Sequence, residues 1–261
     1  MTDLLRAIVE ERRADARLAM QEKPLETLRE AACMHARRSL AARLSQSRTQ
    51  PVVAEMKKAS PSAGLLRESY CPDELAVAYA QAGAAGLSVL TEPRRFLGSC
   101  DHLQAARAAV DLPVLRKDFL CDPYQVAESA ALGADVVLII LAALTPDEAR
   151  RLYDEALAWD LEALVEAHTE TEVEFALEMD NALIGVNSRD LKTLKTDLAT
   201  ARRLAAMIPR QRLSIAESGL RSPSDLAELS KLGYNGFLVG EAFMRHPKPA
   251  DVLREWLRAD G

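Results

Sequence analysis

Several charged side chains in this sequence come directly after short apolar runs. Lys117, Glu166 and Glu217 each stand at the end of such a run. A lysine that lies among other cations loses part of its affinity for protons, so it can act as a general acid near neutral pH. A carboxylate across the site can accept a proton in a later step. These residue types predict acid–base catalysis, provided that the fold brings them together.

Other polar residues occupy equivalent places. A single charged residue after a strand is usually a solvated loop residue. Here many such residues follow runs that are otherwise apolar, which favours a shared binding or catalytic site. None of the four histidines ends a run, and His168, two residues after Glu166, is interpreted as a structural or surface residue. The set comprises Glu55, Lys57, Thr91, Glu92, Lys117, Asp118, Glu166, Asn187, Arg189, Asp190, Glu217 and Glu241.

The apolar runs recur about every 25 residues, a usual length for one strand and one helix. Gly83, Gly133 and Gly233 lie 50 and 100 positions apart, and each precedes such a run. A glycine there can end a helix in the left-handed conformation. An apolar run without alternation fits a strand that is buried on both faces. The predicted strands cover 51–54, 87–90, 113–116, 136–139, 161–165, 182–186, 212–216 and 237–239.

The stretches between these strands have the features of helices. Thr145-Pro146 and Ser222-Pro223 each join a capping side chain to a proline suited to the first turn. Eight strands that alternate with eight helices predict a (β/α)8 barrel, which we expect to span residues 1–261 as a single domain. A doubly wound open sheet is the structural alternative, but no G-x-G-x-x-G motif follows an early strand. In such a barrel, reactive groups at the strand ends meet at one mouth.

Residues 1–50 precede the first strand and carry apolar side chains at helical spacing. We expect an N-terminal extension of two or three amphipathic helices that packs against the barrel. It could be a structural cap at one end of the barrel or a lid over a substrate. The spacing depends on Leu4, Leu5, Ile8 and Val9, and later on Leu25, Leu28 and Ala31.

Composition excludes some classes of protein. The formal charge is −6, from 33 basic and 39 acidic side chains, which argues against a general nucleic-acid binder. No apolar run is long enough to predict a membrane span. The first residues lack the pattern of a signal peptide, so we expect a cytoplasmic protein. Free thiols, rather than disulfides or a zinc site, are expected at Cys33, Cys71, Cys100 and Cys121.

Two glycine-containing pairs near the C-terminus indicate a phosphate site. Ser218-Gly219 follows the seventh predicted strand, and Gly240-Glu241 follows the eighth. Loops after these two strands often bind phosphate in barrels through backbone N–H groups. Glycine allows the backbone to approach a ligand closely. The two pairs together predict a phosphorylated small molecule as the substrate.

The motifs resemble those of the indole-3-glycerol phosphate synthase family. Residues 53–62, Val-Ala-Glu-Met-Lys-Lys-Ala-Ser-Pro-Ser, closely resemble that family's first-strand signature. The first-strand and third-strand motifs are highly specific, whereas the glycine pairs are shared with many phosphate-binding barrels. The N-terminal extension is also similar to that family's. Further similar stretches occur, in the family's order, at 114–119, 164–168, 184–191, 217–219 and 238–242.

The resemblance implies a reaction that builds an indole ring in tryptophan biosynthesis. The substrate would be 1-(2-carboxyphenylamino)-1-deoxyribulose 5-phosphate, and the products indole-3-glycerol phosphate, carbon dioxide and water. Neither a metal nor an organic cofactor is implied. Lys117 would protonate the substrate ketone while the aromatic carbon attacks it. Glu166 would assist the later loss of water, with Lys57 as its partner or as an alternative acid.

The resemblance also implies contacts with the substrate. Glu55 and Asn187 would orient it and its developing charges. Phe96 and Phe119 could flank its aromatic ring, although core packing is an equal alternative for either. The remaining candidates are Lys57 and Arg189 for the carboxylate, Ser218, Gly219, Gly240 and Glu241 for the phosphate, and Ser60 and Glu217 as further substrate contacts.

Three positions depart from the family's usual pattern. Ser188 stands where a second asparagine is common, Ala216 where serine is frequent, and Cys121 where the residue is often aliphatic. None of these removes a predicted catalytic group. One alternative function is that of another phosphosugar barrel, such as an isomerase, which would use Asp or Cys at its strand ends. The other is a catalytically silent barrel that serves as a binding or assembly partner.

Overall fold

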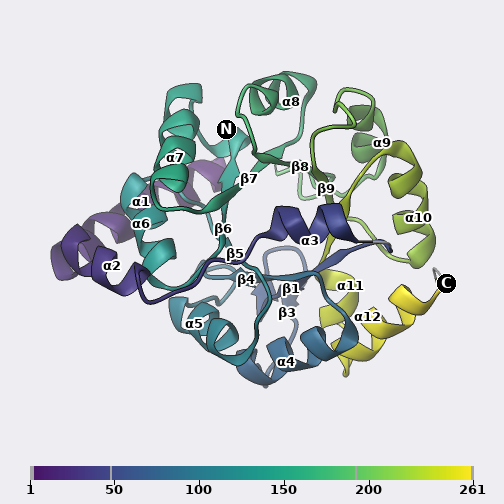
Figure 1. The fold of residues 1–261 in the computed structure, drawn as a ribbon, viewed down its shortest axis with the longest axis horizontal. Coiled ribbons are helices and arrows are strands. Elements are labelled where there is room, and N and C mark those ends of the chain that lie inside the picture. Colours follow the sequence, from purple (N-terminus) through teal and green to yellow (C-terminus); the bar gives the residue numbers. More distant parts are fainter. Residues whose placement is uncertain (1–2, 48, 192, 260–261) are drawn as a thin grey trace.

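The protein forms a closed barrel of eight parallel strands (Figure 1). It is described by a computed structural model that covers residues 3–47, 49–191 and 193–259. The first strand pairs with both the second and the last, so the sheet has no open edge and the doubly wound alternative is wrong. The predicted (β/α)8 barrel is confirmed. Its strands are β1 (Val52–Met56), β4 (Gly86–Leu90), β5 (Val114–Lys117), β6 (Val136–Ile140), β7 (Glu162–Ala167), β8 (Leu183–Asn187), β9 (Ser214–Glu217) and β10 (Gly236–Val239).

Helices surround the barrel and begin and end where the sequence indicates. Thr145 and Ser222 cap their helices through capping boxes, each followed by proline. Gly83 and Gly233 end theirs at φ values of 100° and 118°, a left-handed conformation that favours glycine. The helices are α4 (Pro72–Ala82), α5 (Cys100–Ala109), α6 (Pro123–Ala131), α7 (Pro146–Ala158), α8 (Glu170–Leu177), α9 (Ala199–Ala205), α10 (Pro223–Leu232), α11 (Glu241–Met244) and α12 (Pro249–Arg258), with a 3-10 turn, η1 (Leu141–Ala143).

The strand pleat divides the core into two layers. Apolar residues on one face, such as Val52 and Val114, pack against the surrounding helices. Residues on the other face, such as Val53 and Leu115, fill the barrel interior. Because side chains alternate along a strand, the residue two positions beyond an interior one also faces inward. Glu55 and the other charged candidates follow interior apolar residues at this spacing.

Six of the eight strands extend one or two residues beyond their predicted ends, and β4 and β10 end as predicted. Glu55, Lys117 and Glu166 therefore belong to β1, β5 and β7 themselves, not to the loops that follow. A parallel neighbour holds the backbone at each of these positions: Lys117 lies in register with Leu90 of β4, and Glu166 is paired on both sides. The site residues consequently stand on the most rigid part of the fold.

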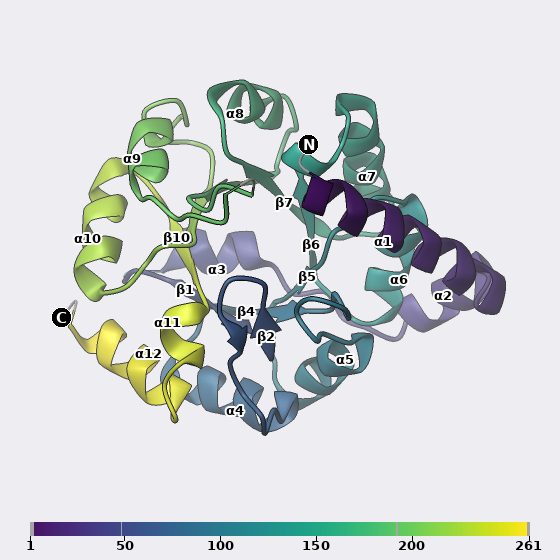
Figure 2. The same ribbon diagram turned by 180° about the vertical axis from the view of Figure 1, so that it is seen from behind.

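The N-terminal extension contains three helices, α1 (Asp3–Glu22), α2 (Leu25–Ala32) and α3 (Leu40–Gln46). Helix α3 closes the amino-terminal end of the barrel, where Leu40 and Leu44 join the interior core (Figure 1). Helix α1 lies at the opposite end, on the face that also carries the short hairpin of β2 (Ala59–Ser60) and β3 (Gly64–Leu65), and it packs against α6 and η1 (Figure 2). Helix α3 therefore takes the expected role of a cap, and α1 borders the carboxyl ends of the strands, where the role of a lid stays a prediction.

A buried ion pair fixes α1 to the barrel. Arg12 donates from Nε to Asp118 Oδ1 at 3.0 Å and from Nη2 to Oδ2 at 2.6 Å. Thr91 also donates to Asp118 Oδ2, at 2.6 Å, and the Arg116 guanidinium lies 3.3 Å from the same oxygen. Burial opposes ionisation of Asp118, but the two arginines and Thr91 keep its pKa below the usual range. Asp118, the residue next to Lys117, thus joins the N-terminal extension to the barrel.

Replacing Arg12 with methionine should lower the free energy of unfolding by about 3 kcal/mol, because the Asp118 carboxylate would lose its bidentate partner while remaining buried. Urea denaturation measures this loss. Arg94→Met is the matched control, since Arg94 pairs with Asp15 near the surface at 2.6 Å and should contribute less than about 1 kcal/mol. Equal losses in the two variants would contradict the assignment of Arg12 as the main anchor of α1.

Candidate active site

A cavity of about 750 Å³ opens at the carboxyl ends of the barrel strands. Its wall contains every residue singled out from the sequence as catalytic or substrate-binding. The charged groups therefore do converge on one mouth. These residues are Glu55, Lys57, Ser60, Phe96, Lys117, Phe119, Glu166, Asn187, Arg189, Glu217, Ser218, Gly219, Gly240 and Glu241.

Lys117 occupies the centre of a buried charge cluster. Its Nζ lies 3.0 Å from Glu166 Oε2 and 2.5 Å from Glu217 Oε2. The three side chains come from β5, β7 and β9, and the two carboxylates are almost completely buried. Burial acts to lower the pKa of Lys117, but Glu166 and Glu217 outweigh it and raise that pKa above the usual range. Lys117 is therefore an ammonium that can donate a proton when a stronger base forms beside it.

This corrects the interpretation of Lys117 from the sequence. We expected neighbouring cations to weaken its hold on the proton, whereas its contacts are carboxylates. Lys57, the other lysine of the site, is engaged with Glu55 in a separate ion pair. Residue types at strand ends show which charges share the mouth, but side-chain direction decides which of them are adjacent.

Glu166 and Glu217 share the Lys117 ammonium, and their pKa values differ. Burial acts to raise the pKa of Glu166, but Lys117, His168 and a hydrogen bond from Asn187 lower it below the usual range. Burial and the nearby Glu166 charge raise the pKa of Glu217 to about 7, despite the contact with Lys117. Such a separation of two neighbouring carboxyls is the arrangement that acid–base catalysis requires.

Two glycines make room for the carboxylates of the site. A Cβ atom at Gly185 on β8 would overlap Oε1 of Glu217. A Cβ atom at Gly240, after β10, would overlap Oε1 of Glu55. Each glycine therefore allows a neighbouring strand to carry a carboxylate inside the barrel mouth, where any larger residue would displace it.

Arg189 connects three of the loops around the cavity. Its guanidinium donates to Ser62 in the loop after β1 at 2.8 Å and to Glu241 at the start of α11 at 3.1 Å. Asn187 Oδ1 accepts a hydrogen bond from the Arg189 backbone at 2.9 Å, which shapes the start of that loop. Arg189 is only partly exposed, so its charge faces the cavity and the facing loops.

The predicted phosphate cradle has an unusual backbone conformation. Ser218 and Gly219 have φ values of 64° and 82°, so two successive residues lie in the left-handed region. Successive N–H groups in such a turn can point toward a common anion. The Glu241 carboxylate pairs instead with Arg189 and Arg245, so only its backbone N–H can serve a phosphate.

The apolar wall of the cavity combines Phe96 and Phe119, which the sequence analysis assigned to the site, with residues that it did not assign. Phe96 and Phe119 lie with ring centroids 6.3 Å apart and both reach the cavity. The fourth strand, which offers no reactive group, supplies Leu138 and Ile140. Helix α1 adds Leu4, Leu5 and Ile8, whose helical spacing alone gave no indication that they would face a cavity.

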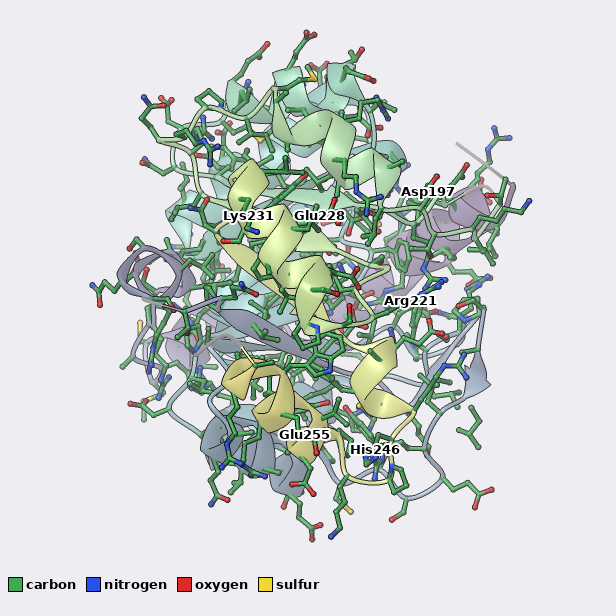
Figure 3. All side chains as sticks on the ribbon, turned by 90° about the vertical axis from the view of Figure 1, so that its right-hand side faces the viewer. Asp197, Arg221, Glu228, Lys231, His246 and Glu255 are labelled. Atoms are coloured by element: carbon green, nitrogen blue, oxygen red, sulfur yellow. The ribbon has the colours of Figure 1, made fainter. Side chains whose placement is uncertain are left out.

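Polar residues at the other end of the cavity also escaped the sequence analysis. Arg221 and His246 belong to the lining; Figure 3 shows Arg221 beside the start of α10 and His246 after α11. Arg245 also belongs to the lining and pairs with Glu241 at 2.8 Å. Each follows a strand end by several residues, which explains why a reading of the strand ends alone missed it.

Glu92 is absent from this cavity wall, contrary to the expectation that it would face the mouth. Its carboxylate is fully buried and accepts hydrogen bonds from the backbone N–H groups of residues 94, 95 and 96, at 3.1, 2.7 and 2.9 Å. It stabilises the loop that carries Phe96. Thr91 likewise supports Asp118 and does not line the cavity.

A closed eight-stranded barrel with a lysine among carboxylates at its strand ends defines an α/β-barrel enzyme. A solved structure described as "Native KDPGal structure" shares this fold, with a TM-score of 0.58, 16% identity, and coverage of 82% of this chain and 95% of that one. The described part of the chain has no helix long and apolar enough to cross a membrane.

Sequence comparisons define the family. The family model of indole-3-glycerol phosphate synthase matches residues 5–256. An indole-3-glycerol phosphate synthase of Rhodospirillum rubrum is 47% identical over 97% of this chain and 98% of its own length. One of Azospirillum brasilense is 52% identical over 79% of each chain. The chain belongs to the indole-3-glycerol phosphate synthase family, which confirms the resemblance found in its motifs.

Replacing Glu217 with glutamine should change stability in a pH-dependent way. Its pKa of about 7 in the folded state, against an ordinary 4.5, means that the folded state binds more protons between these values. Its contribution therefore falls as pH rises through this window. Glu217→Gln should be about 3 kcal/mol more stable than the unsubstituted protein at pH 8 and nearly equal to it at pH 4.

Urea denaturation at both pH values measures this difference. The comparison with Glu228→Gln serves as a control, because Glu228 is exposed on α10 and pairs there with Arg202. A stability difference for Glu217→Gln that does not depend on pH would show that this carboxyl is an ordinary acid in the folded protein.

Proposed function

We propose that this chain catalyses the reaction named by its family, the conversion of 1-(2-carboxyphenylamino)-1-deoxyribulose 5-phosphate into indole-3-glycerol phosphate, carbon dioxide and water. The observation that carries the proposal is the position of Lys117, whose ammonium lies within 3.0 Å of both Glu166 and Glu217 in a cavity with an apolar wall. An acid and a base of unequal strength are thus within reach of one bound molecule.

Ring closure uses the proton of Lys117. The aromatic carbon that bears the carboxylate attacks the ketone carbon, and the ketone oxygen becomes a hydroxyl by taking a proton from the Lys117 ammonium. The bond to the carboxylate then breaks, carbon dioxide leaves, and its electron pair restores the aromatic ring. Glu166 and Glu217 hold the ammonium in place until a developing alkoxide, a far stronger base than either carboxylate, draws the proton away.

Dehydration uses the same cluster in a second role. The new hydroxyl leaves as water after it receives a proton, and the new ring gives up a proton as its double bond forms. We assign the acceptance of that proton to Glu166, whose low pKa keeps it ionised. Lys57 is the second ammonium in the cavity, and it is the partner or alternative acid for the departing hydroxyl. Oε1 of Glu217, which has no hydrogen-bond donor among the described residues, is free to orient the substrate.

The cavity offers a separate region for each part of the substrate. The left-handed turn at Ser218 and Gly219, with Gly240 and the backbone of Glu241, is assigned to the phosphate. The apolar wall that contains Phe96, Phe119 and the residues of α1 is assigned to the benzene ring. We assign further contacts with the substrate to Lys57 and Arg189 for its carboxylate, to Glu55 and Asn187 for its orientation, and to Ser60 in the hairpin.

The apolar wall also favours this substrate over a phosphosugar alone. An isomerase of phosphosugars has to hold a small, polar molecule, for which Leu138, Ile140 and two phenylalanine rings would be poor neighbours. A catalytically silent barrel is distinguished by assay: purified protein incubated with the carboxyphenylamino deoxyribulose phosphate should generate indole fluorescence, and no product at high protein concentration would refute the enzymatic function.

Lys117→Ala should lower kcat by about 10³-fold or more, because it removes the proton donor of ring closure. Indole fluorescence measures turnover, and circular dichroism checks that the fold is retained. Lys231→Ala is the matched control, since Lys231 lies exposed on α10, away from the cavity (Figure 3), and this variant should be fully active. Near-normal turnover by Lys117→Ala would remove Lys117 from the assigned role.

Glu166→Gln should slow dehydration more than ring closure, because only the later step needs its carboxylate. In a single turnover, a ring-closed and decarboxylated intermediate should accumulate, heavier than the product by one water. Rapid quenching followed by mass spectrometry detects it. A variant that slows substrate loss and product formation equally, without such an intermediate, would argue that Glu166 acts before the ring closes.

A further inference from the structure

His168 lies behind the candidate catalytic residues, between two carboxylates. It follows β7 directly, and its ring points between Glu166 of that strand and Glu172 of α8. Nε2 is 3.5 Å from Glu166 Oε1, and Nδ1 is 3.7 Å from Glu172 Oε2. Both ring nitrogens are buried. These separations are longer than most hydrogen bonds, and they bring the two carboxylates within ion-pair distance of a protonated ring.

Glu172 is itself held firmly in place. Its Oε2 accepts hydrogen bonds from the backbone N–H groups of His168, at 2.6 Å, and Thr169, at 3.2 Å. Thr169 caps α8 through the reciprocal bond to Glu172 N at 3.3 Å. The carboxylate that faces His168 is therefore part of a capping box, and its position is set by the start of the helix.

These groups form a line of alternating charge. Glu172, His168, Glu166 and Lys117 follow one another, with each cation placed between acids. Glu166 uses Oε2 for Lys117 and presents Oε1 to His168. The two oxygens of the Glu166 carboxylate thus face two different side chains. Lys117 lines the cavity, whereas His168 is not among the cavity-lining residues.

We propose that His168 is a positioning residue, an imidazolium that keeps the Glu166 carboxylate ionised and turned toward Lys117. The proposal rests on the proposed function, because it concerns the base of the dehydration step. It adds a residue to that step which the sequence analysis interpreted as structural or as a surface residue. His168 does not touch the cavity, so it acts only through Glu166.

The charged surroundings of His168 agree with this assignment. The groups that face it are Glu166 from β7, Glu172 from α8 and, at longer range, Glu217 from β9. Burial acts to lower the pKa of His168, but Glu172 and Glu166 outweigh it and raise that pKa. The imidazolium is therefore present in acidic solution and is lost as pH rises through its raised pKa. Its effect on Glu166 should appear on the acidic side of the pH–rate profile.

The test is the pH profile of kcat for His168→Asn, measured with the full chain. Without the imidazolium, the pKa of Glu166 should rise, and the acidic limb of the profile should move toward neutral pH by about one pH unit. On that limb kcat should fall about tenfold, while KM stays within about twofold and the rates converge above neutral pH. A general loss of structure would lower kcat at every pH.

Glu172→Gln provides a second variant that keeps the helix start intact. Glutamine can occupy this place in a capping box, yet it removes the outer negative charge that holds the imidazolium. It should move the acidic limb in the same direction, by less than His168→Asn does. This variant keeps the proposal testable if His168→Asn does not fold.

Two controls separate the proposal from simpler causes. Thr169→Ala weakens the cap of α8 without altering the charges near Glu166, and His35→Asn repeats the substitution at the amino-terminal end of the barrel, where His35 faces Ala131 O at 3.2 Å. Both should leave the acidic limb in place. An unchanged limb in His168→Asn and Glu172→Gln, with active unsubstituted protein, would overturn the role of His168. Inactive unsubstituted protein would overturn the proposed function instead.

Discussion

The structure depends on the cost of keeping the Lys117 ammonium away from water at the mouth of a barrel. A buried charge is tolerated only where opposite charge compensates its lost hydration. Glu166 and Glu217 supply that compensation from two other strands, at 3.0 and 2.5 Å. Since one cation cannot satisfy two acids equally, the same contact that stabilises Lys117 leaves the carboxyls with different proton affinities. Stability and chemical reactivity thus have a common origin here.

At the end of β5, two successive residues serve different purposes: Lys117 the chemistry, and Asp118 the support of the site. Lys117 points into the cavity, whereas the Asp118 carboxylate is engaged by Arg12, Arg116 and Thr91. This cluster is almost fully buried and attaches helix α1 to the strand end. Because α1 also contributes apolar residues to the cavity wall, its attachment beside Lys117 places an apolar surface close to the buried ammonium. At the end of β7, His168 likewise contacts Glu166 from outside the cavity.

The barrel could be predicted from the sequence because the strand period, the proline-led helix starts and the helix-ending glycines are local signals. The residues around the cavity could also be predicted, since parallel strands bring their carboxyl ends to one side. The sequence could not predict which of these charged side chains pair with one another. Glu92 and Glu166 look alike in sequence, but one faces its own loop and the other the cavity. The part of α1 that lines the cavity was equally hidden, because contacts over more than a hundred residues leave no local pattern.

Gly185, which lies against the Glu217 carboxylate, constrains the order in which substitutions can accumulate in this site. Any side chain at position 185 would meet the Glu217 carboxylate, so a substitution there requires that this carboxylate move or that residue 217 become smaller. Gly240 and Glu55 are linked in the same way. Libraries that vary one position at a time would therefore discard combinations in which both members of a pair change. The accessible routes from this barrel to another chemistry run through paired substitutions on neighbouring strands.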